Sequence, residues 1–296
     1  MMSTVEAKKL QKGTLGRGEV VWLAVVIVSA ILLYLRTFAY CWKAWSEETQ
    51  YSLAYLVPFV SGYFLWKKWP DVRKAERSPS VWGLVLIIIA VTMHLGGTLL
   101  DISGPSSVSI LLYLIGACIY FHGPGLVKAL AFPLAYLVFA VPVPGGVTDI
   151  IGFPLQLWAS GSTAVMLRAI GMEVTRTGVN LSVPGFEFQV AEACSGMSSL
   201  VALVGVTAVF AYVTRLHPWQ KWFLFFLAAP IALAANILRI TTIALVGYKW
   251  GSDAATGMYH NWSSPILFFA AIVILFFINW GLEWLNGRRT ISSSRS

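Results

Sequence analysis

Long uninterrupted apolar runs constrain the chain more than any other feature of its sequence. Residues 81–100, for example, contain no acidic residue, lysine or arginine, and a helix of about 20 apolar residues crosses the roughly 30 Å hydrocarbon layer of a membrane. Hydrophobic residues make up 57% of the chain and charged residues 11%, whereas soluble domains have roughly 25% charged residues. Because the runs lack the two-residue alternation of barrel strands, the sequence predicts an all-α polytopic membrane protein.

We expect about eight transmembrane helices within a single integral membrane domain, residues 19–286, between tails at 1–18 and 287–296. The apolar stretch from Ile150 to Ile170 is interrupted by Pro154 and several polar residues, so we expect it to be interfacial or partly buried between other helices. The expected spans are Glu19 to Arg36, Tyr51 to Trp66, Val81 to Leu100, Ser106 to His122, Leu126 to Val141, Met197 to Val213, Gln220 to Leu238 and Ser264 to Leu282.

The distribution of basic residues predicts the orientation of these spans. Fifteen of the 21 lysines and arginines fall on the side of the two termini, and cytoplasmic segments near span ends are enriched in Lys and Arg. Both termini are therefore expected in the cytoplasm. The formal charge of +8 is explained by this orientation, so the lipid bilayer is an expected partner and nucleic acid is not. The six basic residues expected outside are Arg36, Lys43, Arg168, Arg176, Arg239 and Lys249.

The longest expected extracytoplasmic segment runs from Pro142 to Gly196. Apolar residues alternate with more polar ones on both sides of Pro184 and Gly185, which is the pattern of a small hairpin with a turn between its strands. We therefore expect a hairpin just before the sixth span. Its second strand leads directly to Cys194 and the start of that span.

Three outer residues are candidates for chemistry. Cys194 is expected at a helix start, where the helix dipole favours a thiolate, although it is alternatively a small packing residue. Arg239 lies about one helical turn after Asn236, and it either faces a protein interior or reaches up to the headgroups. His260, just before the eighth span, is either a base or an interfacial residue. A thiol, a base and a fixed cation are together the parts required for covalent acyl transfer.

The sequence around these residues resembles the exosortase and archaeosortase family of membrane cysteine enzymes. The resemblance covers roughly Pro142 to Leu282 and rests on three motifs in the family's order. They are Gly178-Val179-Asn180-Leu181 with Val190-Ala191-Glu192-Ala193-Cys194-Ser195-Gly196, then Ala235-Asn236-Ile237-Leu238-Arg239-Ile240, and then Gly257-Met258-Tyr259-His260.

The resemblance implies a catalytic trio of Cys194, Arg239 and His260, in a catalytic part of about residues 142–282. Asn236, Glu192, Ser195 and Gly196 are expected to support the trio. Glu192 either orders the loop or pairs with an arginine, or it is simply exposed to solvent. Such an enzyme is a thiol protease or transpeptidase in the cytoplasmic membrane of a bacterium, with its active site outside. It would use no metal ion or organic cofactor.

The resemblance also implies a substrate class. The expected partners are membrane-anchored proteins with a C-terminal sorting tail, made of a short Pro-Glu-Pro-type (PEP-CTERM-like) motif, a transmembrane helix and a basic end. Their processing would be linked to protein sorting and to exopolysaccharide and biofilm production. The alternative is a non-catalytic transporter or assembly subunit for exopolysaccharide export, in which Arg239 holds an anionic group and Cys194 only packs.

The remaining cysteines and outer arginines have simpler expected roles. Cys118 is expected to pack in the core, whereas Cys41 either packs or pairs with Cys194, which would abolish the nucleophile. Arg168 and Arg176 are expected to contact headgroups or a substrate carboxylate.

Overall fold

The computed structural model describes residues 17–48, 51, 53–142, 145–190 and 196–293. Two compact units divide the chain, with the boundary between them at Pro144 and Gly145 apart from a short segment at residues 49–52. The first unit contains α2 to η2, and the second contains α9 to α13.

Helices account for the described part of the first unit, and α5 and α6 form its closest helix pair. The backbones approach so closely that a Cβ at Gly83 would lie 2.6 Å from the carbonyl oxygen of Gly116, which is typical of membrane helix pairs with small residues at the contact. The elements are α2 (Arg17–Glu47), α3 (Val57–Lys67), α4 (Trp69–Lys74), α5 (Val81–Leu99), α6 (Ser103–Phe121), α7 (Pro124–Ala129), α8 (Ala131–Tyr136) and the 3-10 helix η2 (Leu137–Ala140).

Two expected spans of this unit differ from the observed helices. The second span corresponds to α3, which has only 11 residues and is too short to cross a bilayer alone. The fifth span, Leu126 to Val141, is divided among α7, α8 and η2. Pro133 lies in this stretch and has no N–H to donate to a helical hydrogen bond, and its own carbonyl accepts a hydrogen bond from Ser61 Oγ at 2.8 Å.

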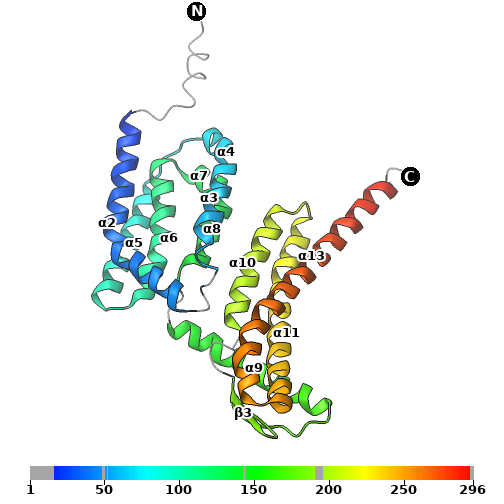
Figure 1. Ribbon diagram of the computed structural model, residues 1–296. Coiled ribbons are helices and arrows are strands. Elements are labelled where there is room, and N and C mark those ends of the chain that lie inside the picture. Colours follow the sequence, from blue (N-terminus) through cyan, green and yellow to red (C-terminus); the bar gives the residue numbers. More distant parts are fainter. Residues whose placement is uncertain (1–16, 49–50, 52, 143–144, 191–195, 294–296) are drawn as a thin grey trace, which may run out of the picture. The chain divides into compact units, whose positions relative to one another are not determined.

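Long helices and a small sheet make up the described part of the second unit. Helices α10, α11 and α13 pack against one another, and α9 and the sheet pack against α11 (Figure 1). The elements are α9 (Gly145–Ala169), β1 (Thr175–Thr177), β2 (Asn180–Val183), β3 (Phe186–Gln189), α10 (Met197–Val213), α11 (Pro218–Trp250), α12 (Ser252–Ala254), the π-helix η4 (Ala255–Tyr259) and α13 (His260–Ser293).

The sheet is antiparallel with the order β1-β2-β3. Strands β2 and β3 pair with Val183 opposite Phe186, on either side of the Pro184-Gly185 turn. Gly185 has φ +78°, as the third residue of a type II turn requires. Strand β1, whose three residues are all exposed, was not expected from the sequence, because it carries no apolar alternation.

Helix α11 belongs to both hydrophobic clusters of the second unit. Its first half contributes Leu224, Ala228 and Ala232 to a cluster with α10 and α13. Its second half contributes Ile240 and other buried residues to a cluster with α9 and the sheet. Asn236 and Arg239 lie on the turn between the two halves.

One expectation for the second unit is wrong in its boundary. The seventh span was expected to end near Leu238, but α11 continues to Trp250 and ends at Gly251, whose φ is +86°. Arg239 therefore lies inside a helix and not at its end. The stretch from Ile150 belongs to the continuous helix α9, in spite of Pro154.

Five helices in the described part of the chain are long and apolar enough to cross a membrane. This supports an all-α membrane protein, although the expected count of eight is not reproduced by length and composition. Two shorter apolar helices cover Ala131–Ala140 and Met197–Val213. The five long segments are Val81–Leu99, Ser103–Phe121, Ile150–Ala169, Pro218–Trp250 and Trp262–Asn286.

The contact between the sheet and α11 gives a testable prediction. A Cβ at Gly247 would lie 2.2 Å from Cδ1 of Phe186, so Gly247→Ala has to displace the buried ring. We expect this overpacking to lower the free energy of unfolding by about 1–3 kcal/mol. The measurement is chemical unfolding of the full-length protein in detergent.

Gly281→Ala is the matched control, because a Cβ at Gly281 in α13 meets no atom within 4 Å. It is expected to leave stability unchanged or to raise it slightly, since alanine is the better helix former. Equal stability of Gly247→Ala and Gly281→Ala would show that the sheet is not held by this contact.

Candidate functional site

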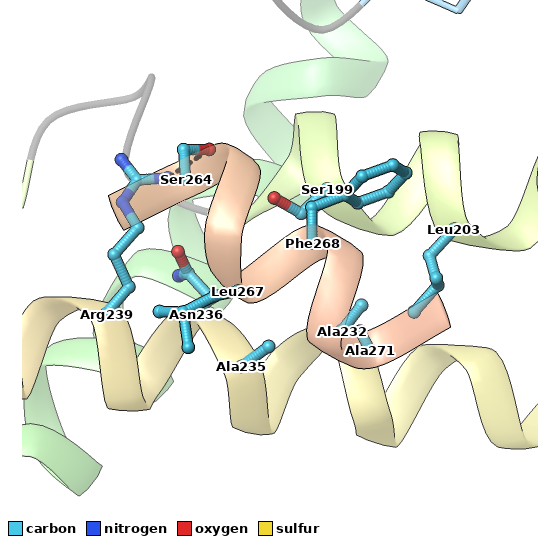
Figure 2. Close-up of a pocket in the computed structure, with 10 residues that line it drawn as sticks. All are labelled: Ser199, Leu203, Ala232, Ala235, Asn236, Arg239, Ser264, Leu267, Phe268 and Ala271. Atoms are coloured by element: carbon cyan, nitrogen blue, oxygen red, sulfur yellow. Dashed lines mark hydrogen bonds between the residues drawn. The ribbon is translucent and has the colours of Figure 1, made fainter. Parts of the chain in front are cut away.

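One turn of α11 carries two buried polar side chains. Asn236 and Arg239 are 3% and 5% exposed, and Arg239 Nη1 donates a hydrogen bond to Ser264 Oγ at 3.3 Å. Figure 2 shows the arginine reaching from α11 towards Ser264 on α13. Of the alternatives for Arg239, the structure supports an arginine in the protein interior.

The start of α10 packs against the same turn of α11. Gly196 precedes the helix with φ +85°, and a Cβ at this position would lie 2.9 Å from Nδ2 of Asn236. A side chain at this position would therefore have to displace the amide of Asn236. L-residues also rarely adopt this backbone conformation. The chain thus passes directly over Asn236 where α10 begins.

The start of α13 reaches this turn from the other direction. His260 is the first residue of α13, and Ser264, the partner of Arg239, follows one helical turn later. A kink at Gly257 in η4 (φ −84°, ψ −113°) separates this start from the end of α11. The side chain of His260 lies outside the described part of the structure.

A narrow cavity lies between α10, α11 and α13. Its volume is about 10 Å³, close to the space that one water molecule needs. Figure 2 shows Arg239, Asn236 and Ser264 towards one end of the cavity and Leu203 and Ala271 towards the other. The polar lining consists of Ser199, Asn236, Arg239 and Ser264.

Arg176 fastens the sheet to α9. Its Nε donates to Gly178 O at 2.8 Å and Ser160 Oγ at 3.2 Å, and its Nη2 donates to Leu157 O at 3.1 Å. Arg168 Nη2 likewise donates to Val174 O at 2.9 Å. Both arginines, expected to contact headgroups or a substrate, are therefore engaged within the fold.

Several of the expected site residues fall outside the described residues. These are Cys194, Glu192 and Ser195, whereas Gly196, Asn236 and Arg239 are described and lie together. Cys41 is a free thiol buried in the first unit, with its Sγ 3.9 Å from Ser107 Oγ, which agrees with packing and not with a disulfide. In the described part, no group of three or more His, Cys, Asp and Glu residues is placed to hold a metal ion.

Comparison with known families identifies this chain. A model of the transmembrane exosortases matches residues 45–277. The chain belongs to the transmembrane exosortase family. Comparisons with curated proteins and with solved structures gave no match. Membership in this family and the apolar helices together establish a multi-pass membrane protein.

Ser264 and Ser199 were not identified as site residues from the sequence, and the structural role of Arg176 was not expected. Ser264 could have been found, because it lies four residues after His260 and so shares a helix face with it. Ser199 likewise lies one turn after the start of α10. The role of Arg176 depends on carbonyl groups of α9, which no sequence pattern reveals.

Gly196 provides the test of this arrangement. Gly196→Ala combines an unfavourable backbone conformation with the contact to Asn236, whereas Gly171→Ala has only the first, since Gly171 has φ +86° and a Cβ there meets no atom within 4 Å. We expect Gly196→Ala to be less stable than Gly171→Ala by roughly 1–3 kcal/mol. Unfolding of both full-length variants in detergent measures the difference.

A second readout concerns Cys194 itself, in a background with Cys41 and Cys118 replaced. We expect its alkylation rate to change in Gly196→Ala and to stay at the parental value in Gly171→Ala. If the two variants agree in stability and in alkylation rate, the approach of Gly196 to Asn236 has no importance for the site.

Proposed function

We propose that this protein is a membrane cysteine protease or transpeptidase that cleaves C-terminal sorting tails of membrane-anchored proteins. Exosortases are generally a family of cysteine proteases and transpeptidases, which supports the class of reaction. Cys194 is the nucleophile, Arg239 stabilises the oxyanion and His260 transfers the proton. The basic-residue distribution supports an active site on the extracytoplasmic side of a bacterial cytoplasmic membrane.

The observation that carries the proposal is the convergence on one turn of α11. Gly196, two residues after Cys194, approaches Asn236, and Ser264, four residues after His260, contacts Arg239. Two residues of chain span at most about 7 Å. The convergence supports the proposal because Cys194 and His260 are only two and four residues along the chain from the residues that reach this turn.

The proposed reaction is an acyl transfer through a thioester. The Cys194 thiolate attacks the scissile carbonyl carbon, and the carbonyl oxygen becomes an oxyanion. Collapse of this intermediate breaks the C–N bond, and the leaving amine takes a proton from the His260 imidazolium. Water or an amine then attacks the thioester, releases the product and regenerates the thiol.

Arg239 suits the stabilisation of an oxyanion because its side chain is buried and hydrogen-bonded to Ser264. A charge–charge interaction is stronger where water is excluded, and the hydrogen bond to Ser264 fixes one nitrogen of the guanidinium. The planar fork presents N–H donors in a fixed geometry, which matches the oxygen atom of an oxyanion. A headgroup-binding arginine would instead be exposed to the membrane surface.

An apolar groove beside Gly196 suits the apolar part of a substrate tail. Its volume is about 270 Å³, and it opens between α9, α10 and α11. Gly196 is one of its lining residues, which supports a role of the groove beside the proposed nucleophile. The other lining residues are Leu155, Leu200, Ala229, Pro230 and Leu233.

The central test is co-expression with a protein that carries a Pro-Glu-Pro-type tail. We expect Cys194→Ala to abolish cleavage while still forming a complex with the intact tailed protein, because only the reacting atom is removed. Arg239→Lys keeps the charge but loses the planar fork, and cleavage should fall on the order of 10² to 10³-fold. Immunoblots of tail loss and co-purification measure both effects.

Cys118→Ala is the control, since Cys118 is a half-buried residue of α6 in the first unit. It should cleave the tail at the normal rate. Full processing by Cys194→Ala would show that Cys194 is not the nucleophile and would favour the non-catalytic assembly subunit. Normal processing by Arg239→Lys would show that the guanidinium has only a docking role.

The groove gives a second prediction with a matched pair of variants. Ala229 and Ala234 are both exposed alanines of α11, but only Ala229 lines the groove. We expect Ala229→Phe to slow tail cleavage severalfold by filling the groove, with alkylation of Cys194 unchanged, and Ala234→Phe to cleave normally. Equal cleavage by the two variants would exclude the groove from substrate binding.

A further inference from the structure

The first unit contains a pocket that the proposed reaction does not use. It has a volume of about 460 Å³ and lies between α2, the end of α5 and the start of α6. Charged side chains form its rim and buried hydroxyl groups contribute to its wall. The residues used in the argument below are Arg36, Thr37, Tyr40, Lys43, Asp101 and Ser106.

The rim of this pocket is basic along α2. Arg36, Tyr40 and Lys43 are spaced by four and three residues, so they share one helix face. The side chains of Arg36 and Lys43 are 75% and 69% exposed. Both cations are thus available to a ligand that enters from the surface.

The acidic partners of these cations are held only weakly. Arg36 Nη2 lies 3.2 Å from Asp101 Oδ1, and Lys43 Nζ lies 3.9 Å from Glu47 Oε2. Exposed ion pairs of this kind contribute little free energy. An incoming anion can therefore share or replace these partners at small cost.

The wall of the pocket contains a buried polar network. Thr37 and Ser106 are both 4% exposed, and their hydroxyl oxygens lie 2.8 Å apart. Ser106 Oγ also lies 2.7 Å from Nδ1 of His94. A hydroxyl group offers one donor and two acceptor positions, so both hydroxyls retain capacity for a ligand that carries hydroxyl groups of its own.

The backbone conformation of Asp101 brings its carboxylate to the pocket. Asp101 has φ +54° and is the only non-glycine residue with a positive φ in the described part of the chain. This conformation closes the short connection between α5 and α6 and directs the chain so that Asp101 faces Arg36. The carboxylate adds a hydrogen-bond acceptor beside Arg36.

Aromatic residues indicate the depth of the pocket in the membrane. Trp42 and Trp45, on the same stretch of α2 as Lys43, both make edge contacts with Tyr55, with ring centroids 5.4 and 5.6 Å apart. Tryptophan and tyrosine gather at the headgroup level of membrane helices. The pocket therefore lies where lipid phosphates are abundant.

We propose that this pocket binds the headgroup of an anionic phospholipid that carries free hydroxyl groups. Arg36 and Lys43 hold the phosphate, since arginine and lysine are both favoured phosphate ligands. Thr37, Ser106 and Asp101 hydrogen-bond the hydroxyl groups of the same headgroup. Phosphatidylglycerol combines these two features and is the probe for the test.

The test is native mass spectrometry of the full-length protein in detergent, titrated with phosphatidylglycerol or with phosphatidylcholine of the same acyl chains. We expect one phosphatidylglycerol to bind in preference to phosphatidylcholine. In the double variant Arg36→Gln, Lys43→Gln this preference should fall by about tenfold or more. The control Lys249→Gln, which removes an exposed lysine of the second unit near Trp250, should keep the full preference.

Two further measurements test whether the headgroup hydroxyl groups are recognised and whether the phosphate belongs to a lipid. Thr37→Val should reduce the preference for phosphatidylglycerol over phosphatidic acid, which has the phosphate without the headgroup glycerol. Glycerol phosphate in solution should not displace the bound lipid at equal concentration. The proposed lipid site does not depend on tail cleavage, so either proposal can be wrong while the other is right.

Three results would overturn the proposal. Equal binding of phosphatidylglycerol and phosphatidylcholine would show that the acyl chains alone are recognised. An unchanged preference in the double variant would place the binding elsewhere. Displacement by glycerol phosphate at equal concentration would make the ligand a soluble phosphate ester.

Discussion

Arg239 carries a permanent charge at a position where 95% of its surface is covered and its neighbours are mostly apolar. Removing an ion from water costs several kcal/mol, so the surrounding chain has to supply polar groups for it. Ser264 does so from α13, with Ser199 and Asn236 nearby. Alanines at 232 and 235 leave room for these groups between the helices. The arrangement of the three helices around this turn follows from that requirement.

The sequence predicted the membrane class better than the helix boundaries. Long apolar runs can be recognised from neighbouring residues alone. So can an arginine among them, whose charge is costly to place in lipid, and burial of Arg239 inside the protein was therefore among the expected alternatives. The end of α11 was misplaced because a charged residue is not a helix breaker, and the breaker is Gly251. Strand β1 was missed because its residues are exposed. Likewise, α7 and α8 share one apolar run that Pro133 helps to divide.

The small sheet is attached to two helices of the second unit. Arg176 connects it to α9, and Phe186 fills the space over Gly247 of α11. Strand β3 then leads towards α10. The described residues before and after positions 191–195 are both packed: Val190 lies in the core, and Gly196 lies against Asn236.

Helix α11 contributes both to the groove and to the buried guanidinium, nearly two helical turns apart, so its geometry sets the distance between them. From Leu233 to Arg239 the helix rises about 9 Å, which corresponds to roughly three residues of an extended peptide. For a tail bound in the proposed way, the number of residues between the first apolar side chain and the scissile bond is thereby set by helix geometry. Inserting a residue into the tail would shift the cleaved bond, while replacing apolar side chains would change affinity and leave the position of cleavage unaltered.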